Sequence, residues 1–377
     1  MRKAVMILIA LICVGAAVNR NAFKSDISNR DVVQGVGIDI NEDGTYTVTL
    51  ETINTENYSN ADGAAKPVMN LRTLKGKTVS TAIKSAYSID GKTPVLSQNR
   101  VIVIGKELAE KGILPSLDFF IRDAENYPTV QIAVVEEKAA DFFKNASSES
   151  TVVSRNIEKI LLTSDDDMTV SSITLCELVN RSKSAGHSFY VPIIETFKEK
   201  DRPEIKSKGT AVFKEGKYVC NLNEEETSAL NFLCNNARKG SVDFNTDEGS
   251  AAISIIRCKT VRKVDYSAES PNFHIKIKID ADIAEADSST GYSLSESEID
   301  ALKGYAEEKI KNDIEKLTRK LYSEEKADVA GLSRLIYIHY PELFRKNEKK
   351  LSEIMTESQY FAEVEICVRR IGQDYVS

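Results

Sequence analysis

Oxygen-bearing side chains near the start of the chain have the spacing of half a calcium site. Asp39, Asn41, Asp43 and Gly44 match the first half of a calcium-binding loop, in which ligands alternate along the chain. The twelfth position of such a loop needs a bidentate glutamate, and Leu50 occupies it. Because residues typical of strands flank the motif on both sides, the turn of a β-hairpin explains these residues better than a metal site.

Other residue types that could carry out chemistry are scattered. Residues 35–37 are Gly-Val-Gly, which is half of a dinucleotide-binding fingerprint, and residues 165–167 are three adjacent aspartates. The three histidines, His187, His274 and His339, lie in separate segments. The sequence has no nucleophile-elbow, phosphate-loop or HExxH motif. We therefore expect no catalytic residues, no metal site and no cofactor.

A polar cluster at the end of a predicted helix is the best candidate for a functional contact. Arg122, Asp123 and Glu125 lie off an apolar stripe at helical spacing. That stripe consists of Leu117, Phe120, Ile121 and Ala124. Two interpretations remain open: the cluster contacts a partner protein, or Arg122 braces a neighbouring loop or carboxylate.

The elements around this cluster predict an α+β protein with several domains. Residues 100–104 and 129–135 have the composition of buried strands, and residues 31–53 that of a hairpin. Alternation over residues 272–281 predicts a strand with one wet face, and residues 295–325 form the longest predicted helix. We expect mixed or antiparallel sheets, each covered by helices, and a C-terminal antiparallel sheet with the long helix packed on it.

Composition shifts divide the chain into four segments. Residues 1–18 are an N-terminal targeting or anchoring segment, and residues 19–148 an α/β domain. Residues 149–205 are a small, mostly helical middle region, and residues 206–377 a C-terminal α+β domain. The last boundary is placed in residues 198–207, which are charged, contain a proline and lack periodicity.

The N-terminus predicts a location outside the cytoplasm. Residues 4–18 are apolar and uncharged and follow Arg2-Lys3, a pattern typical of a secretory signal or, if uncleaved, of a membrane anchor. Cys13 is a candidate for lipidation, although Ile12 is large for the position before a lipid-modified cysteine. The net charge of −7 is dispersed over both signs, so nucleic acid is not an expected partner.

Basic residues on two predicted strands offer a surface for lipid headgroups. Alternatively, these residues form the charged face that a strand exposed to water ordinarily has. The basic residues are Arg257, Lys259, Arg262, Lys263, Lys276 and Lys278.

Short motifs distributed in order along the chain resemble the C subunit of the nutrient germinant receptors of spore-forming bacteria, the germinant receptor lipoprotein family. The matching segments are residues 35–39 (GVGID), 76–78 (GKT), 97–100 (SQNR), 105–109 (GKELA), 117–125 with its Arg-Asp pair, and 208–213 (KGTAVF). The chain departs from the family in residues 19–30, which lack the usual lipidated cysteine and tryptophan.

The resemblance implies a non-enzymatic subunit of a receptor that triggers spore germination. It implies two integral-membrane subunits as partners and a position at the membrane surface, on the outer face of the spore inner membrane. An extracytoplasmic solute-binding protein is the alternative, and it would need a deep cleft with converging polar groups.

Overall fold

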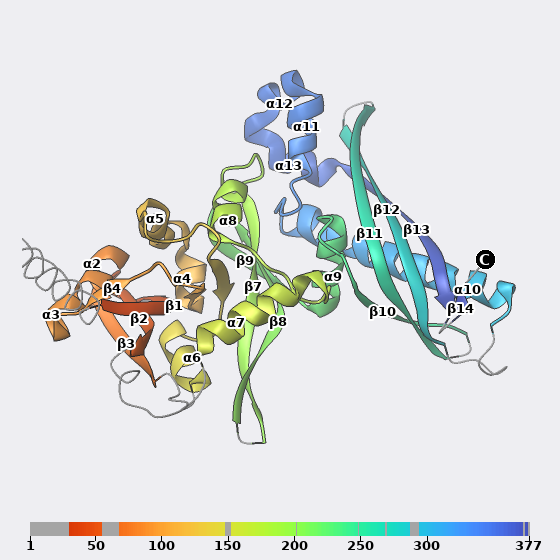
Figure 1. The fold of residues 1–377 in the computed structure, drawn as a ribbon. Coiled ribbons are helices and arrows are strands. Elements are labelled where there is room, and N and C mark those ends of the chain that lie inside the picture. The colour runs from red at the N-terminus through yellow and green to blue at the C-terminus, as the bar shows by residue number, and fades with distance from the viewer. Residues whose placement is uncertain are drawn as a thin grey trace, which may run out of the picture.

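The protein forms two β-sheets with helices packed against them (Figure 1). The computed structural model describes residues 30–54, 68–147, 152–200, 202–247, 249–267, 270–286, 294–371 and 374–375. Over these residues the first sheet has nine strands and the second has five. Cys13 and the apolar run of residues 4–18 lie outside the described residues. No helix within the described ranges is long and apolar enough to cross a membrane.

Parallel strands form the centre of the first sheet. They are β1 (Arg30–Ile40), β5 (Val101–Ile104), β6 (Gln131–Val134) and β7 (Ser188–Glu199), and short β4 (Thr93–Val95) pairs with the start of β1. Antiparallel strands extend the sheet on both sides: β2 (Tyr46–Asn54) and β3 (Val68–Gly76) beyond β1, and β8 (Arg202–Lys214) and β9 (Lys217–Leu222) beyond β7. The predicted hairpin and both predicted buried strands are confirmed.

Helices cover both faces of this sheet because its central strands are apolar on both faces. In β5, Val101 and Val103 pack with α6 (Ala139–Ala146) and α7 (Val153–Leu162). Ile102 and Ile104 point to the other face. The helices there are α2 (Val79–Lys84), α4 (Lys106–Lys111), α5 (Leu114–Arg122) and α8 (Leu175–Ser182).

Two buried carboxylates from the first hairpin cap helices about a hundred residues away. Neither α6 nor α7 has a side-chain cap from its own N-cap residue. Asp39 instead accepts hydrogen bonds from the backbone N–H groups of Ala139 (2.8 Å) and Ala140 (3.0 Å). Glu51 accepts from Val153 (2.7 Å) and Ser154 (2.9 Å). The hairpin therefore satisfies the free N–H groups with which each helix begins and fixes both helices to the sheet.

Glycines in β1 allow α6 and α7 to approach the sheet closely. A Cβ atom added to Gly35 would lie 2.7 Å from Cβ of Ser154, and one added to Gly37 would lie 3.1 Å from Cβ of Ala139. The Gly-Val-Gly sequence thus has a packing role, and β1 leads into β2 through the Gly44 turn rather than into a helix.

Substitutions at two glycines are expected to change stability in opposite directions. Gly35→Ala should lower the free energy of unfolding by about 1–3 kcal/mol, because the new methyl group overlaps α7. Gly304→Ala should raise it by about 0.5–1 kcal/mol, because that position lies in a helix with open space around it. Urea denaturation of both variants beside the wild type measures the effects. If both substitutions changed the free energy of unfolding in the same direction, the packing role of Gly35 would be contradicted.

The second sheet carries the long helix on one face, as predicted. Its strands are β10 (Gly240–Asn245), β11 (Ser250–Ser267), β12 (Ser270–Ala286), β13 (Gln359–Ile371) and β14 (Asp374–Tyr375). Helix α10 (Glu296–Thr318), which continues as a π-helical turn (Arg319–Glu324), packs an apolar stripe that includes Leu302, Ile310 and Leu317 against this sheet. One detail of the prediction was wrong, because β13 pairs with β12 in parallel.

The parallel pairing follows from the connection between β12 and β13. Helix α10 returns the chain along the sheet, and three short helices then lead it to the end at which β12 begins. These are α11 (Ser333–His339), α12 (Pro341–Asn347) and α13 (Leu351–Glu357). Because the connection ends there, β13 enters the sheet in the same direction as β12.

The middle of the chain contains α7 and α8 and also strand residues. Residues 188–199 form β7, and the segment in which the boundary was predicted contributes residues 198–199 and 202–207 to the paired strands β7 and β8. The hairpin β8–β9 completes the first sheet, and α9 (Glu224–Leu233) follows it. How the chain divides into domains at 148 and 205 stays a prediction.

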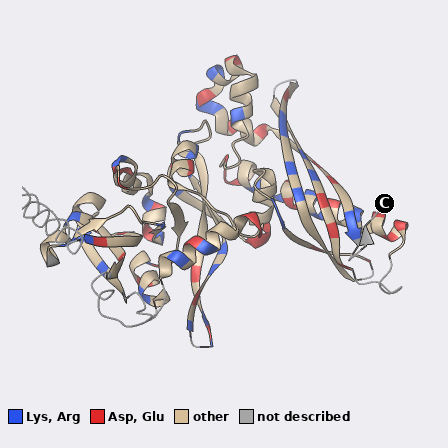
Figure 2. Cartoon of the chain, in the orientation of Figure 1, with Lys and Arg blue, Asp and Glu red and all other residues tan. Residues whose placement is uncertain are grey.

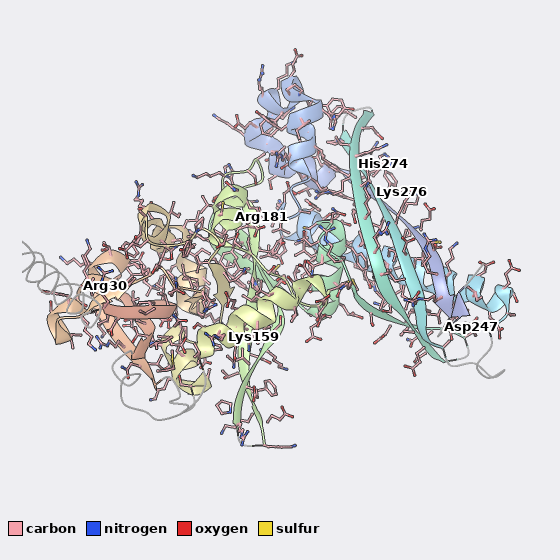
Figure 3. All side chains as sticks on the ribbon, in the orientation of Figure 1. Arg30, Lys159, Arg181, Asp247, His274 and Lys276 are labelled. Atoms are coloured by element: carbon pink, nitrogen blue, oxygen red, sulfur yellow. The ribbon has the colours of Figure 1, made fainter. Side chains whose placement is uncertain are left out.

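Buried side chains connect the two halves. Tyr190 of β7 shares a core with the second sheet. Arg181, labelled in Figure 3, lies over the Tyr190 ring at 4.7 Å and donates a hydrogen bond to the Val329 carbonyl at 3.0 Å. The contact joins α8 to the segment before α11, so the halves pack as one unit at this point.

Candidate partner-contact site

The candidate cluster lies at the end of α5, a helix anchored by its other face. Leu117 and Phe120 are buried in the core of the first sheet, and Ser116 donates a hydrogen bond to the Ile113 carbonyl at 2.7 Å. Pro115 stands in the first turn, where its missing N–H costs nothing. The burial of Leu117 and Phe120 therefore fixes the position of the end of α5.

Arg122 forms an ion pair within its own helix. Its Nε atom lies 2.8 Å from Oδ2 of Asp118, one turn earlier, and the Arg122 side chain is 78% exposed. The hydrogen bond and the charge of Asp118 raise the pKa of Arg122. Arg122 therefore pairs with a neighbouring carboxylate of its own helix, and both interpretations of the cluster, partner contact and bracing, stay predictions.

The loop after α5 is held by a buried asparagine. The side-chain amide of Asn126 donates to the carbonyl oxygens of Phe120 and Tyr127, both at 3.3 Å, and its oxygen accepts from Asn99 at 3.4 Å. Asp123 ends the helix and accepts a hydrogen bond from the backbone N–H of Glu125 at 2.8 Å. The backbone of Glu125 is thus hydrogen-bonded within the loop, and its side chain is exposed.

Two apolar side chains beside the cluster were not predicted as part of it. Ile121, predicted to be buried, is 47% exposed, and Tyr127 is exposed as well. Ala124 is also exposed, because the helix ends at Arg122 and the stripe cannot continue. Exposed tyrosine and arginine beside aliphatic side chains are typical of protein–protein contacts, so Ile121 and Tyr127 join the candidate site. In the sequence, the Tyr127-Pro128 pair marks a surface turn, and this signal could have indicated that Tyr127 is exposed.

The structure does not bring the other candidate residues together. The carboxylate of Asp39 is turned to α6, while Asp43 accepts hydrogen bonds from Thr45 within the hairpin turn. Asp166 pairs with Lys239, and Asp167 accepts from its own loop at Thr169. Among the described residues, no group of three or more metal-binding side chains is found.

The basic strand residues divide between the two faces of the second sheet. Arg257, Lys259 and Lys263 are exposed, whereas Arg262 donates to the Ala330 carbonyl at 2.7 Å. Lys276 pairs with Glu363 at 2.6 Å, and Lys278 pairs with Glu365 at 3.1 Å. These ion pairs make the face mixed in charge, and Figure 2 shows both basic (blue) and acidic (red) positions along these strands.

A cavity of about 450 Å³ lies between the α8–β7 turn and helices α11 and α12. Its lining includes Lys183, His187, Arg334 and Tyr337. The Nδ1 atom of His187 lies 3.0 Å from the Ser182 carbonyl oxygen, so this ring is partly engaged within its own turn. The cavity is the feature that a solute-binding protein would use.

The fold and both halves of the chain match one protein family. The model of the spore germination protein N-terminal domain matches residues 24–196. The model described as "Spore germination B3/GerAC like, C-terminal" matches residues 208–372. The chain belongs to this family of spore germination proteins, the germinant receptor C subunits.

Individual relatives agree with this assignment. Spore germination protein KC of Bacillus subtilis is 21% identical over 93% of this chain and 91% of its own length. Spore germination protein A3 of the same species is 22% identical, with 91% and 90% covered. GerQC of Bacillus cereus is 21% identical over 69% of this chain and 70% of its own. The crystal structure of the GerBC protein superimposes with a TM-score of 0.59 over 89% of this chain and 96% of that one, at 21% identity, and has the same fold.

Proposed function

We propose that this chain is a non-enzymatic subunit of a nutrient germinant receptor and helps to trigger spore germination through protein–protein contacts. In this role it lies at the outer face of the spore inner membrane and contacts two integral-membrane subunits. The observation that carries the proposal is the pair of family matches, which follow each other in order over residues 24–196 and 208–372. The candidate site at the end of α5, with Arg122, Asp123 and Glu125, is the proposed partner surface.

Attachment to the membrane is proposed to come from the N-terminal segment. Residues 4–18 are apolar and uncharged, and Cys13 lies among them. Fractionating membranes from cells that produce wild type or Cys13→Ala distinguishes the two forms of attachment. Loss of the variant from the membrane supports lipidation at Cys13, and retention supports an uncleaved apolar anchor.

Deleting the gene in the native sporulating host tests the function. Mutant spores should germinate more slowly than wild type with the receptor's nutrients and normally with a germinant that bypasses receptors. Complementation with the intact gene should restore the response. Normal nutrient germination of the deletion strain, with related genes also removed, would overturn the proposal.

The cavity between the α8–β7 turn and helices α11 and α12 favours the solute-binding alternative. Titrating the purified protein with amino acids and sugars by calorimetry tests it. Binding heat that Arg334→Ala removes would favour this alternative.

A further inference from the structure

Helix α3 (Tyr87–Asp90) carries two large apolar side chains on the outside of the protein. Tyr87 is 63% exposed and Ile89 is 67% exposed, the two highest values among the large hydrophobic side chains of the described residues. Just before them, Ile83 and Ala86 are buried in the core of the first sheet. The chain before α3 is therefore anchored in the core, while Tyr87 and Ile89 are both exposed to water, so covering them would be favourable.

This helix lies where the described chain begins. It leads into β4, in which Thr93 pairs with Arg30 at the start of β1. Figure 3 labels Arg30 at the end of the molecule that carries α3, and the second sheet lies at the opposite end (Figure 1). Only residues 19–29 separate the apolar run from Arg30, and eleven residues span at most about 40 Å. Helix α3 is thus within reach of any membrane that holds residues 4–18.

The charge around α3 fits an anionic lipid surface. Residues 77–92 contain three lysines, Lys77, Lys84 and Lys92, and one acidic residue, Asp90. Lys77 and Lys84 are exposed. Each basic residue near an anionic membrane surface adds attraction, and tyrosine favours the headgroup region because its ring is apolar and its hydroxyl is polar.

We propose that Tyr87 and Ile89 insert into the headgroup region of the membrane to which the N-terminal segment attaches the protein. The inference rests on the proposed membrane attachment and adds the surface that touches the bilayer. With α3 at the bilayer, the second sheet extends away from the membrane.

The chain contains no tryptophan, so a single introduced indole reports on one position. The test variant is Ile89→Trp. Matched controls are Leu162→Trp at the end of α7 and Ile338→Trp in α11, whose native side chains are also exposed, at 59% and 53%. Each full chain is extracted from membranes and reconstituted into vesicles of phosphatidylglycerol and phosphatidylcholine, with or without bromine on the acyl chains.

We expect brominated lipid to quench roughly half or more of the Ile89→Trp emission, since interfacial side chains lie close to the acyl boundary. Both controls should keep nearly all of theirs. Quenching of Ile89→Trp no greater than that of the controls would overturn the proposal, as would failure of the full chain to float with vesicles. Neither outcome alters the deletion phenotype, so the germination role and the membrane surface are tested separately.

Discussion

Replacing Glu51 by alanine should lower the free energy of unfolding by about 2–4 kcal/mol. The Glu51 side chain is fully buried, and its loss leaves the N–H groups of Val153 and Ser154 without acceptors in the core. Glu42→Ala, at the exposed turn of the same hairpin, is the matched control and should have little effect. Urea denaturation measures both. A small effect at Glu51 would mean that α7 finds its N-terminal partners elsewhere.

The pH dependence of this site has a definite sign. Burial raises the pKa of Glu51 above its ordinary value, and the hydrogen bonds from Ser154 and Val153 offset this only in part. A folded state that holds the proton more tightly gains stability at low pH and loses it as pH rises through the raised pKa. The deficit of Glu51→Gln relative to wild type should therefore be larger at pH 4 than at pH 7. A deficit that grows with pH would show that the hydrogen bonds outweigh burial.

Arg122→Glu should leave the fold intact and abolish most of the nutrient response of spores. Its ion pair with Asp118 is exposed on both sides, so the thermal midpoint should stay near that of wild type. A reversed charge within a partner contact should weaken binding on the order of tenfold or more. Germination in a deletion strain complemented with each variant measures the response, and circular dichroism measures folding.

Two controls separate contact from bracing at Arg122. Arg155→Glu reverses the charge of an exposed arginine on α7, and spores that carry this variant should germinate normally. The double variant Asp118→Arg/Arg122→Asp keeps an ion pair within α5 but exchanges its charges. If it germinates like wild type, the pair serves only the helix and the partner contact is wrong. If it remains defective while folded, Arg122 acts outside its own helix.

Local sequence patterns predicted the strands and helices in which the positions of apolar residues show which faces are buried. The apolar run of β5 is buried on both faces, and the stripe of α10 lies on the second sheet. Strand β7 was not predicted, and it contains Pro192, a residue type that normally argues against a strand interior. Strand β7 pairs with β6 only at Ile193, and its long ladder is the one with β8.

Of the residues in the candidate site, the sequence predicted the charged ones but not the exposed apolar ones. Spacing placed Arg122, Asp123 and Glu125 off the predicted apolar stripe, but the exposure of Ile121 depends on where α5 ends. The capping of α6 and α7 was not predictable either, because Asp39 and Glu51 meet partners about a hundred residues later. Local spacing carries no information on such contacts.

The long connection between β12 and its partner β13 determines when the C-terminal half can be completed during synthesis. Strand β12 ends at Ala286 and β13 begins at Gln359, so the whole connection must leave the ribosome before the sheet gains this strand. Until then, the part of the apolar stripe of α10 that packs against β13 stays exposed to water. A nascent chain stopped before Gln359 is therefore open to aggregation or to capture by a chaperone.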